Sequence, residues 1–131
     1  MTTASTAPRH ADTFTPQFIA DRLAIQDLIH RWCRAVDRLD FEAMRGIFHE
    51  GAIDNHNHYH GDIPGLLAWI EGRHEKITFS MHLVGNMVIE FASASVALSE
   101  AYVWCIQRYP ADAKEALVAL TGGARGVEGQ G

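Results

Sequence analysis

At positions 79–86 the sequence reads Phe79-Ser80-Met81-His82-Leu83-Val84-Gly85-Asn86, which opens an apolar strand. Asp37, in Ala35-Val36-Asp37, lies forty-five positions before His82 and closes a long amphipathic helix. Both residues are polar groups in stretches patterned like a core. A carboxylate that contacts an imidazole fixes the tautomer of the ring and stabilises its protonated form. If the helix and the strand bring the two side chains together, the sequence predicts an acid–base pair for proton transfer.

The composition limits the class of protein. The chain has 131 residues, 47% hydrophobic and 21% charged, which predicts one globular domain with a single core. The net charge is -5 and the eleven Lys and Arg residues do not gather in one stretch, which argues against nucleic acid as a partner.

Cys33 and Cys105 have no disulfide or metal-ligand spacing, so we expect both to be buried and free in a reducing compartment. Residues 1–10 lack a signal-peptide core, and no apolar run is long enough to span a membrane; we therefore expect a cytoplasmic protein without a membrane segment.

Hydrophobic spacing and capping residues predict the elements. Helices are expected at residues 15–37, where Thr15-Pro16 is a helix start, at 40–51, where Asp40 is a cap, and at about 63–74. A short strand is expected at residues 52–60, and two long strands at 80–91 and 96–109. The small residues 92–95 join the two long strands into a hairpin.

This order of elements favours an α+β fold, in which a curved antiparallel or mixed sheet wraps around the N-terminal helices and leaves a conical cavity. We expect a flexible N-terminus at residues 1–14 and the folded domain at residues 15–110. Residues 111–120 are patterned as a weak helix, and residues 121–131 are dominated by glycine. We therefore expect a weakly structured tail from residue 111 to residue 131.

Four stretches of the chain carry a family resemblance: residues 24–28 (Ala-Ile-Gln-Asp-Leu), residues 35–41 (Ala-Val-Asp-Arg-Leu-Asp-Phe), Phe48, and residues 81–86 (Met-His-Leu-Val-Gly-Asn). Over about residues 18–109 the chain resembles the SnoaL-like branch of the nuclear-transport-factor-two-like superfamily. Within that branch it is most similar to the scytalone dehydratase, bile acid dehydratase and hexachlorocyclohexane dehydrochlorinase group. The resemblance implies a cystatin-like α+β barrel and a homo-oligomer, either a dimer or a trimer.

The resemblance also implies roles for residues. The helix-end aspartate of the family falls on Asp37 and its strand-start histidine on His82, and this pair removes a proton from carbon while a leaving group departs. Some dehydratases place a tyrosine before the aspartate, whereas Trp32 stands in that neighbourhood here. Since the reaction is proton transfer with elimination or isomerisation, no cofactor is required.

The resemblance ends in the C-terminal part, where members of the family continue with further strands that complete the sheet. This chain has a glycine-rich tail in their place. We expect either a truncated or alternatively read product, which we rank first, or a sheet that closes by pairing with another copy, because an open edge strand favours aggregation.

Aromatic residues supply candidate walls for a pocket that takes a small hydrophobic ring compound. Core packing explains most of them equally well, and only Trp32, Tyr102 and Trp104 are expected to reach a ligand. His30, His49 and His74 are interpreted as surface or helix-end residues without a role.

A second group of polar residues comprises Asp54, His56, His58 and His60. On a strand, the three histidines would lie on one face at a spacing of two. Zinc or iron could use such a face, but no ligand from elsewhere in the chain is evident, so a solvated hairpin or a pocket rim is favoured and no metal is predicted.

Three functions stay open on the sequence alone. The first is a lyase or isomerase, of dehydratase or dehydrohalogenase type, with His82 as base and Asp37 as the group that orients it. The second is a non-catalytic ligand-binding or subunit-association module of the same fold, and the third is an inactive truncated member.

Overall fold

The computed structural model describes residues 8–56 and 58–110 of the chain. Its elements follow the order 3-10 helix η1, helices α1 and α2, strands β1 and β2, helix α3, and strands β3 and β4. The described residues form an α+β fold, in agreement with the sequence prediction. The expected tail at residues 111–131, including its weak helix, lies outside the described residues.

The long helix α1 (Pro16–Arg38) begins and ends at residues that suit those positions. The Thr15 side chain accepts a hydrogen bond from the backbone N–H of Phe18, and Pro16 occupies the first turn, where no backbone N–H is required. At the other end Leu39 adopts a left-handed conformation with φ of 53°, which a leucine adopts at a cost. The helix therefore stops sharply, and the next residue caps helix α2.

A short 3-10 turn, η1 (His10–Thr13), precedes α1. The Arg22 guanidinium donates to Thr13 Oγ1 at 2.7 Å and to the carbonyl of Ile89 at 2.9 Å, and it stacks over the rings of Phe14 and Phe91. The expected flexible N-terminus at residues 1–14 thus contains a 3-10 turn that Arg22 contacts, and its flexibility stays a prediction. The single arginine that ties the turn to α1 and β3 is not recognisable from local sequence pattern.

Two elements differ from the sequence expectation. Helix α2 (Phe41–Arg45) starts at the predicted cap, where Asp40 accepts from the backbone N–H of Ala43 at 3.0 Å, but it ends at Gly46 rather than near Gly51. Residues 52–60 form no single strand: β1 (Ile53–Asn55) and β2 (His60–Asp62) are the two arms of a small antiparallel hairpin.

Tyr59 explains the β1–β2 hairpin. Its hydroxyl donates to the carbonyl of Asp62 at 2.6 Å, and its carbonyl accepts from the backbone N–H of His56 at 2.7 Å, so the chain reverses between β1 and β2. A side chain at Gly61 or Gly65 would clash with the Tyr59 ring or hydroxyl. The expected strand is thus interrupted by a turn that local alternation did not reveal.

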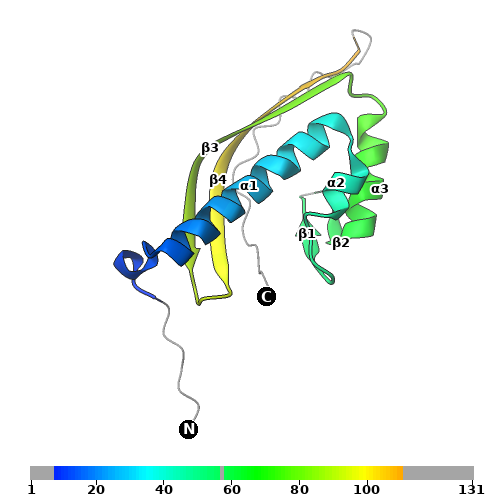
Figure 1. Cartoon of the computed structure of the whole chain (residues 1–131). Helices are drawn as coiled ribbons and strands as arrows, with labels where there is room; N and C mark the ends of the chain where they lie inside the picture. Colours follow the sequence, from blue (N-terminus) through cyan, green and yellow to red (C-terminus); the bar gives the residue numbers. More distant parts are fainter. Residues whose placement is uncertain (1–7, 57, 111–131) are drawn as a thin grey trace.

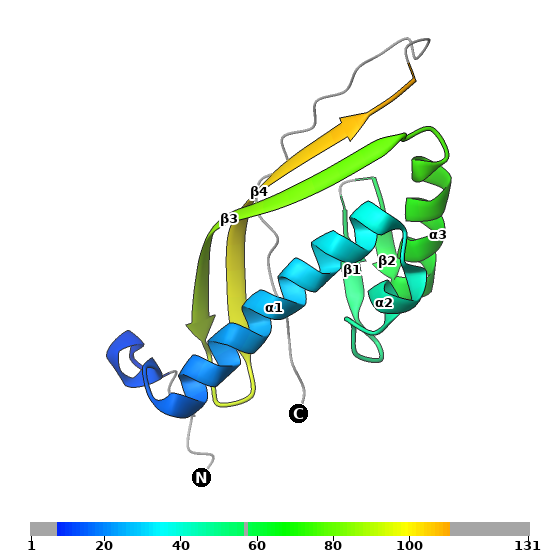
Figure 2. The same cartoon turned by 45° about the horizontal axis from the view of Figure 1, so that its top comes forward.

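Helix α3 (Ile63–His74) follows β2 directly, because Asp62 accepts from the backbone N–H of Gly65 at 2.9 Å. Strands β3 (Phe79–Phe91) and β4 (Ala97–Arg108) form the predicted hairpin, with His82 opposite Cys105 and Phe91 opposite Ala97. The pairing is irregular between Val84 and Met87, and β3 bends there (Figure 2). As a result, inward-facing residues are even-numbered before the irregularity and odd-numbered after it.

The arched hairpin β3–β4 lies along α1, and α2, α3 and β1–β2 gather at the C-terminal end of α1 (Figure 1). Two buried clusters hold this arrangement. One lies where α1 meets α2 and α3, and its fully buried members Met44 and Leu66 each contribute about 2 kcal/mol of hydrophobic stabilisation. The other lies where the start of α1 meets the tip of the hairpin, through Ile89, Phe91 and Ala97.

Candidate functional site

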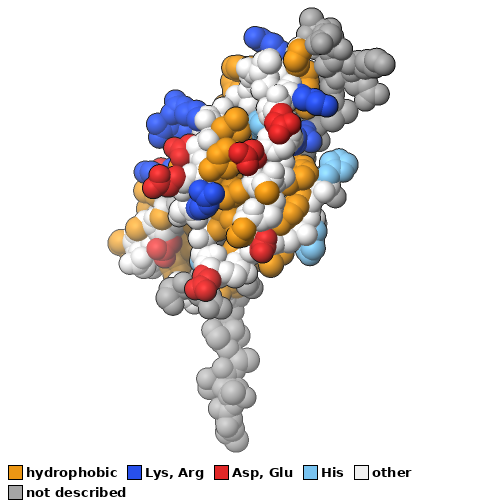
Figure 3. Space-filling model, turned by 90° about the vertical axis from the view of Figure 1, so that its right-hand side faces the viewer, with side chains coloured by type: hydrophobic (Ala, Val, Ile, Leu, Met, Phe, Trp, Pro, Cys, Tyr) orange, Lys and Arg blue, Asp and Glu red, His pale blue; other side chains and the backbone are white. Residues whose placement is uncertain are grey.

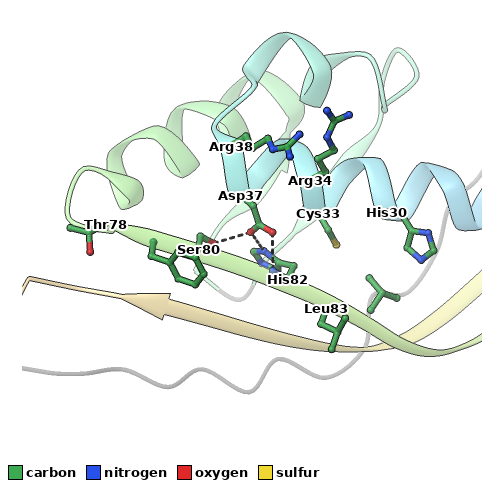
Figure 4. Close-up of a pocket in the computed structure, with 11 residues that line it drawn as sticks. His30, Cys33, Arg34, Asp37, Arg38, Thr78, Ser80, His82 and Leu83 are labelled. Carbon is green, nitrogen blue, oxygen red and sulfur yellow. Dashed lines mark hydrogen bonds and ion pairs between the residues drawn. The ribbon is translucent and has the colours of Figure 1, made fainter.

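Asp37 lies in the last turn of α1, where the negative end of the helix dipole disfavours a carboxylate. Three donors compensate. Asp37 Oδ1 accepts from His82 Nδ1 at 2.6 Å and from the Ser80 hydroxyl at 3.1 Å, and Asp37 Oδ2 accepts from the backbone N–H of His82 at 2.9 Å. Figure 4 shows these interactions between α1 and the start of β3. The structure therefore brings the two predicted catalytic residues into direct contact.

The contact decides which nitrogen of His82 is free. Because Asp37 has only acceptor oxygens, Nδ1 of His82 is assigned as the protonated donor, and Nε2 is left for other chemistry. The side chains of both residues are about one-fifth exposed, so a ligand in the groove beside them would find a partly dry environment. This is the arrangement that an imidazole acid–base group requires.

The same contacts change the acidity of His82. Burial alone would lower the pKa of His82, but side-chain interactions with Cys105 and Asp37 outweigh it and raise that pKa from 6.5 to about 9. At neutral pH the ring is therefore mainly an imidazolium paired with the carboxylate. Only the neutral ring can act as a base. His82 must therefore lose a proton before it can accept one from a substrate.

A groove of about 590 Å³ lies against the pair, between α1 and β3. Its walls come from both elements: His30, Cys33, Arg34, Asp37 and Arg38 from the helix, and Thr78, Phe79, Ser80, His82, Leu83 and Val84 from the strand and its approach. The side chains of Arg34 and Arg38 extend away from the Asp37–His82 pair in Figure 4. Both arginines are among the residues that line the groove, but neither guanidinium is directed toward the pair.

Two cysteines lie close to the site, and both are free thiols. Cys33 is buried, and that burial raises the pKa of its thiol to about 11. Cys105 is only half-buried, which corrects the expectation that both are buried, and it lies directly opposite His82 in the β3–β4 ladder. The sequence analysis assigned neither residue a role.

The three aromatic residues predicted to contact a ligand do not line the groove. Trp32 packs edge-on against Phe48, with ring centroids 5.1 Å apart, beside the core cluster of α1, α2 and α3. Tyr102 and Trp104 lie on the outer face of β4 and are 66% and 60% exposed. Cys105 is the residue opposite His82, so the neighbouring position 104 points to the other face of the sheet. None of the three is among the residues that line this groove, and their contact with a ligand stays a prediction.

The histidines of the β1–β2 hairpin do not form one face of a strand either. His56 and His58 lie in the turn, and only His60 belongs to β2. His56 pairs with Asp54 at 3.0 Å. Within residues 8–56 and 58–110, no group of three or more His, Cys, Asp or Glu side chains is placed to hold a metal ion.

His74 was interpreted as a surface or helix-end residue, but it is buried at the end of α3. Its Nδ1 donates to the carbonyl of Ile70 at 2.8 Å, and its Nε2 has no hydrogen-bond partner among the described residues. Burial lowers the pKa of His74, so the ring stays neutral beside the charged pair. Its place at the end of an apolar helix, rather than its residue type, decides its burial.

A comparison with protein-family models matches the SnoaL-like domain over residues 17–125. The chain belongs to this family. The Asp37–His82 contact lies inside the matched range, and the recognition made from the four sequence stretches is confirmed. A comparison with curated proteins gives no match.

Two solved structures from Novosphingobium aromaticivorans share the fold. One, described as a candidate scytalone dehydratase, has a TM-score of 0.66 and 18% identity, over 73% of this chain and 66% of that chain. The other, described as a candidate aromatic ring hydroxylase, has a TM-score of 0.64 and 26% identity, over 70% of this chain and 68% of that chain. The chain therefore spans about two thirds of the length of these structures.

Two further observations concern the surface. In the described part of the chain, no helix is both long enough and apolar enough to cross a membrane. On the face shown in Figure 3, Lys and Arg side chains are interspersed with Asp and Glu rather than gathered in one patch. That face offers no concentrated positive charge for a nucleic acid.

Proposed function

We propose that this SnoaL-like domain is a lyase or isomerase for small ring compounds, in which Asp37 and His82 carry out acid–base catalysis. The observation that supports the proposal most directly is the 2.6 Å contact between His82 Nδ1 and Asp37 Oδ1, with Ser80 and the His82 backbone holding the same carboxylate. A structural ion pair would need no free ring nitrogen beside a groove. Here His82 lines the groove, and within residues 8–56 and 58–110 Asp37 occupies only its Nδ1, so Nε2 is available to a ligand or to the Cys105 thiol.

In the proposed mechanism, Nε2 of neutral His82 removes a proton from a carbon next to a carbonyl or a halogen-bearing carbon. Asp37 stabilises the imidazolium that forms. The electron pair of the broken C–H bond then expels a hydroxyl or halide leaving group, or moves the double bond. With a hydroxyl leaving group, the imidazolium returns its proton to the departing oxygen, so the ring ends in its starting state.

The substrate class follows from the groove and from the chemistry. A hydrophobic ring compound with a carbonyl or halogen would provide an acidic C–H bond. Arg34 and Arg38, the cationic groups of the groove, would attract an anionic substituent at its rim. The description of one of the two solved structures, a candidate aromatic ring hydroxylase, names a ring compound and supports this class. No cofactor is required for such a reaction, and this stays a prediction, as does the cytoplasmic location.

The test is a panel of cyclic ketones and halogenated rings in deuterium oxide, with substrate C–H exchange and product formation followed by NMR. His82→Ala should reduce exchange at least about a hundredfold, because general-base catalysis contributes that much or more. His49→Ala is the matched control, since His49 is exposed and its ring hydrogen-bonds the carbonyl of its neighbour Glu50 rather than a residue of the site. Equal exchange in the wild type and in His82→Ala would remove the proposed role of the histidine.

The pH dependence gives a second readout of the same site. Because the pKa of His82 is about 9, the neutral base is a minor species at pH 7 and becomes the major one above pH 9. The kcat/KM for exchange should therefore rise about tenfold per pH unit from pH 7 and level off near pH 9. A rate that is flat between pH 7 and pH 9 would contradict His82 as the base.

A second function, subunit association, is favoured by the outer face of the β3–β4 hairpin. Large apolar side chains there are more than a third exposed, which is unusual for a free surface: Met81, Val88, Leu98, Tyr102, Trp104 and Ile106. The partner we propose is a second copy of this chain, as the family resemblance implies. Glu90, Glu100 and Arg108 are also exposed on these two strands, so a second copy would have to pair them or leave them in solvent.

The double substitution Tyr102→Lys with Trp104→Lys tests this association. Both residues are on the outer face, so the fold should survive while like charges separate the subunits. We expect analytical ultracentrifugation to show an oligomer for the wild type and a monomer for the double variant. A wild type that is monomeric at high concentration would exclude self-association, and would leave the ligand-binding and inactive-member alternatives to the exchange experiment.

A further inference from the structure

Cys105 extends the Asp37–His82 pair by a third group. It is the direct cross-strand partner of His82, and both side chains point to the face of the hairpin that lies along α1. Residues opposite each other in an antiparallel ladder have Cβ atoms about 5 Å apart, close enough for a thiol to meet an imidazole. The Cys105 thiol is also one of the groups that raise the pKa of His82.

The orientation of the imidazole fits this contact. Asp37 occupies Nδ1 of His82 at 2.6 Å, so the nitrogen left for another partner is Nε2. A thiol, an imidazole and a carboxylate in this order form the arrangement that activates nucleophilic cysteines in unrelated proteins. Asp37 comes from α1, His82 from β3 and Cys105 from β4, so only the folded chain assembles it.

We propose that Cys105, His82 and Asp37 form a thiol–imidazole–carboxylate triad in which Cys105 is a nucleophile for an α,β-unsaturated ring carbonyl. The proposal uses the histidine and the aspartate of the proposed function, but it does not require that the protein catalyse elimination. The ligand class follows from the chemistry of the thiol, which is a soft nucleophile. It also matches the kind of product that loss of water or halide beside a ring carbonyl would give.

The addition step balances without any further reactant. Neutral His82 takes the proton of the Cys105 thiol, and the thiolate sulfur attacks the β-carbon of the unsaturated carbonyl. A C–S bond forms, and the electron pair of the C=C bond moves to give an enolate. The enolate then takes the proton back from the His82 imidazolium at the α-carbon, so the product is a neutral thioether and the histidine is regenerated.

Cys33 provides an internal control in the same chain. It also lies beside the site, but it is buried, and the pKa of its thiol is raised to about 11. Cys33 is among the residues that line the groove and Cys105 is not, so a reagent that modified thiols by simple proximity to the groove would reach Cys33 first. The triad predicts a strong preference for Cys105.

The experiment exposes the full-length protein to 2-cyclohexen-1-one at pH 8 and follows adduct formation by intact-protein mass spectrometry, with peptide mapping to locate it. We expect one adduct, on Cys105, that forms at least about tenfold faster than on the same cysteine in the urea-unfolded chain. Asp37→Asn and His82→Gln should each slow the folded protein by about tenfold or more. Cys105→Ser should abolish the adduct.

Preferential modification of Cys33, or equal rates for Cys105 in the folded and unfolded chains, would overturn the proposal. The comparison of folded with unfolded wild type decides the matter even if a variant fails to fold. Deuterium exchange into cyclic ketones, measured on the same sample, reports the proposed elimination chemistry separately. An adduct without exchange would support the triad and contradict the lyase, whereas exchange without an adduct would do the reverse.

Discussion

The two faces of the β3–β4 hairpin differ although the same two strands build both. The inner face, toward α1, carries the Asp37 partners Ser80 and His82 near one end and the buried residue Ile89 near the other. The outer face carries large apolar side chains, among them Trp104, that are exposed. Hydrophobicity therefore does not separate inside from outside in this hairpin. The pairing register does, because one step along a strand moves a side chain to the opposite face.

Neighbouring residues on β3 give the sharpest test of this difference. Ile89 is 4% exposed in the cluster with Phe91 and Ala97, whereas Val88 is 60% exposed on the outer face. Ile89→Ala should reduce the free energy of unfolding by about 3 kcal/mol, and Val88→Ala by less than about 0.5 kcal/mol. Urea denaturation at low protein concentration measures both.

If Ile89→Ala does not fold, Ile89→Val is the milder substitution, with an expected loss of about 1 kcal/mol. Equal losses for the two positions would mean that the outer face is buried in solution, even in a dilute sample. That result would strengthen the case for a tightly associated second copy. It would also contradict the statement that one face of the hairpin is buried and the other exposed.

The sequence was sufficient for features that depend on local pattern. The caps Thr15 and Asp40 and the residues of the long hairpin follow from spacing and turn chemistry, and the family motifs located Asp37 and His82. The recognition of the SnoaL-like family rested on the same stretches. These features share one property: each is decided by residues close together in the sequence.

Features that depend on pairing between distant residues were not predicted. Tyr102 and Trp104 were assigned to the pocket because they follow His82 on the next strand, yet only the register with Cys105 shows that they face outward. The irregular pairing between Val84 and Met87 changes which residues of β3 face inward, from even-numbered before it to odd-numbered after it. No single alternation pattern therefore describes the strand. The approach of Cys105 to His82 was missed for the same reason.

The inner face should also respond to pH, because its histidine has different pKa values in the folded and unfolded chain. The folded pKa of His82 is about 9, above the ordinary value of 6.5, so the folded state binds more protons between these values. The resulting stabilisation is fully present below pH 6.5 and is lost as pH rises through 9. We expect the free energy of unfolding to fall by about 3 kcal/mol between pH 6.5 and pH 9.5.

Asp37→Asn shows how much of this pH dependence of stability comes from the Asp37–His82 pair and how much from other titrating groups. Without the carboxylate, the pKa of His82 should fall while the contribution of Cys105 remains, and the loss of stability above pH 7 should shrink. Denaturation curves at several pH values, with the histidine titrated by NMR in the same samples, measure both quantities. An unchanged histidine pKa in Asp37→Asn would show that the 2.6 Å contact does not persist in solution.

Ser80 offers the smallest and most specific change on the inner face. Its hydroxyl donates to Asp37 Oδ1 at 3.1 Å, the same oxygen that His82 Nδ1 contacts. Ser80→Ala should cost about 1 kcal/mol of stability, because a hydrogen bond to a charged group is lost. The pKa of His82 should move up rather than down, since the carboxylate oxygen then interacts with the imidazolium alone.

NMR titration of the His82 ring in Ser80→Ala measures this shift, with Thr78→Ala as the control. Thr78 lies just before the same strand, and its hydroxyl donates to the carbonyl of Arg108 rather than to Asp37. A rise of a few tenths of a pH unit in Ser80→Ala alone would show that serine and histidine compete for one oxygen. A fall would mean that Ser80 instead holds the carboxylate in position, so that its loss lets Asp37 move away from the ring. The direction of this small shift therefore decides whether the hydroxyl opposes the acid–base pair or supports it.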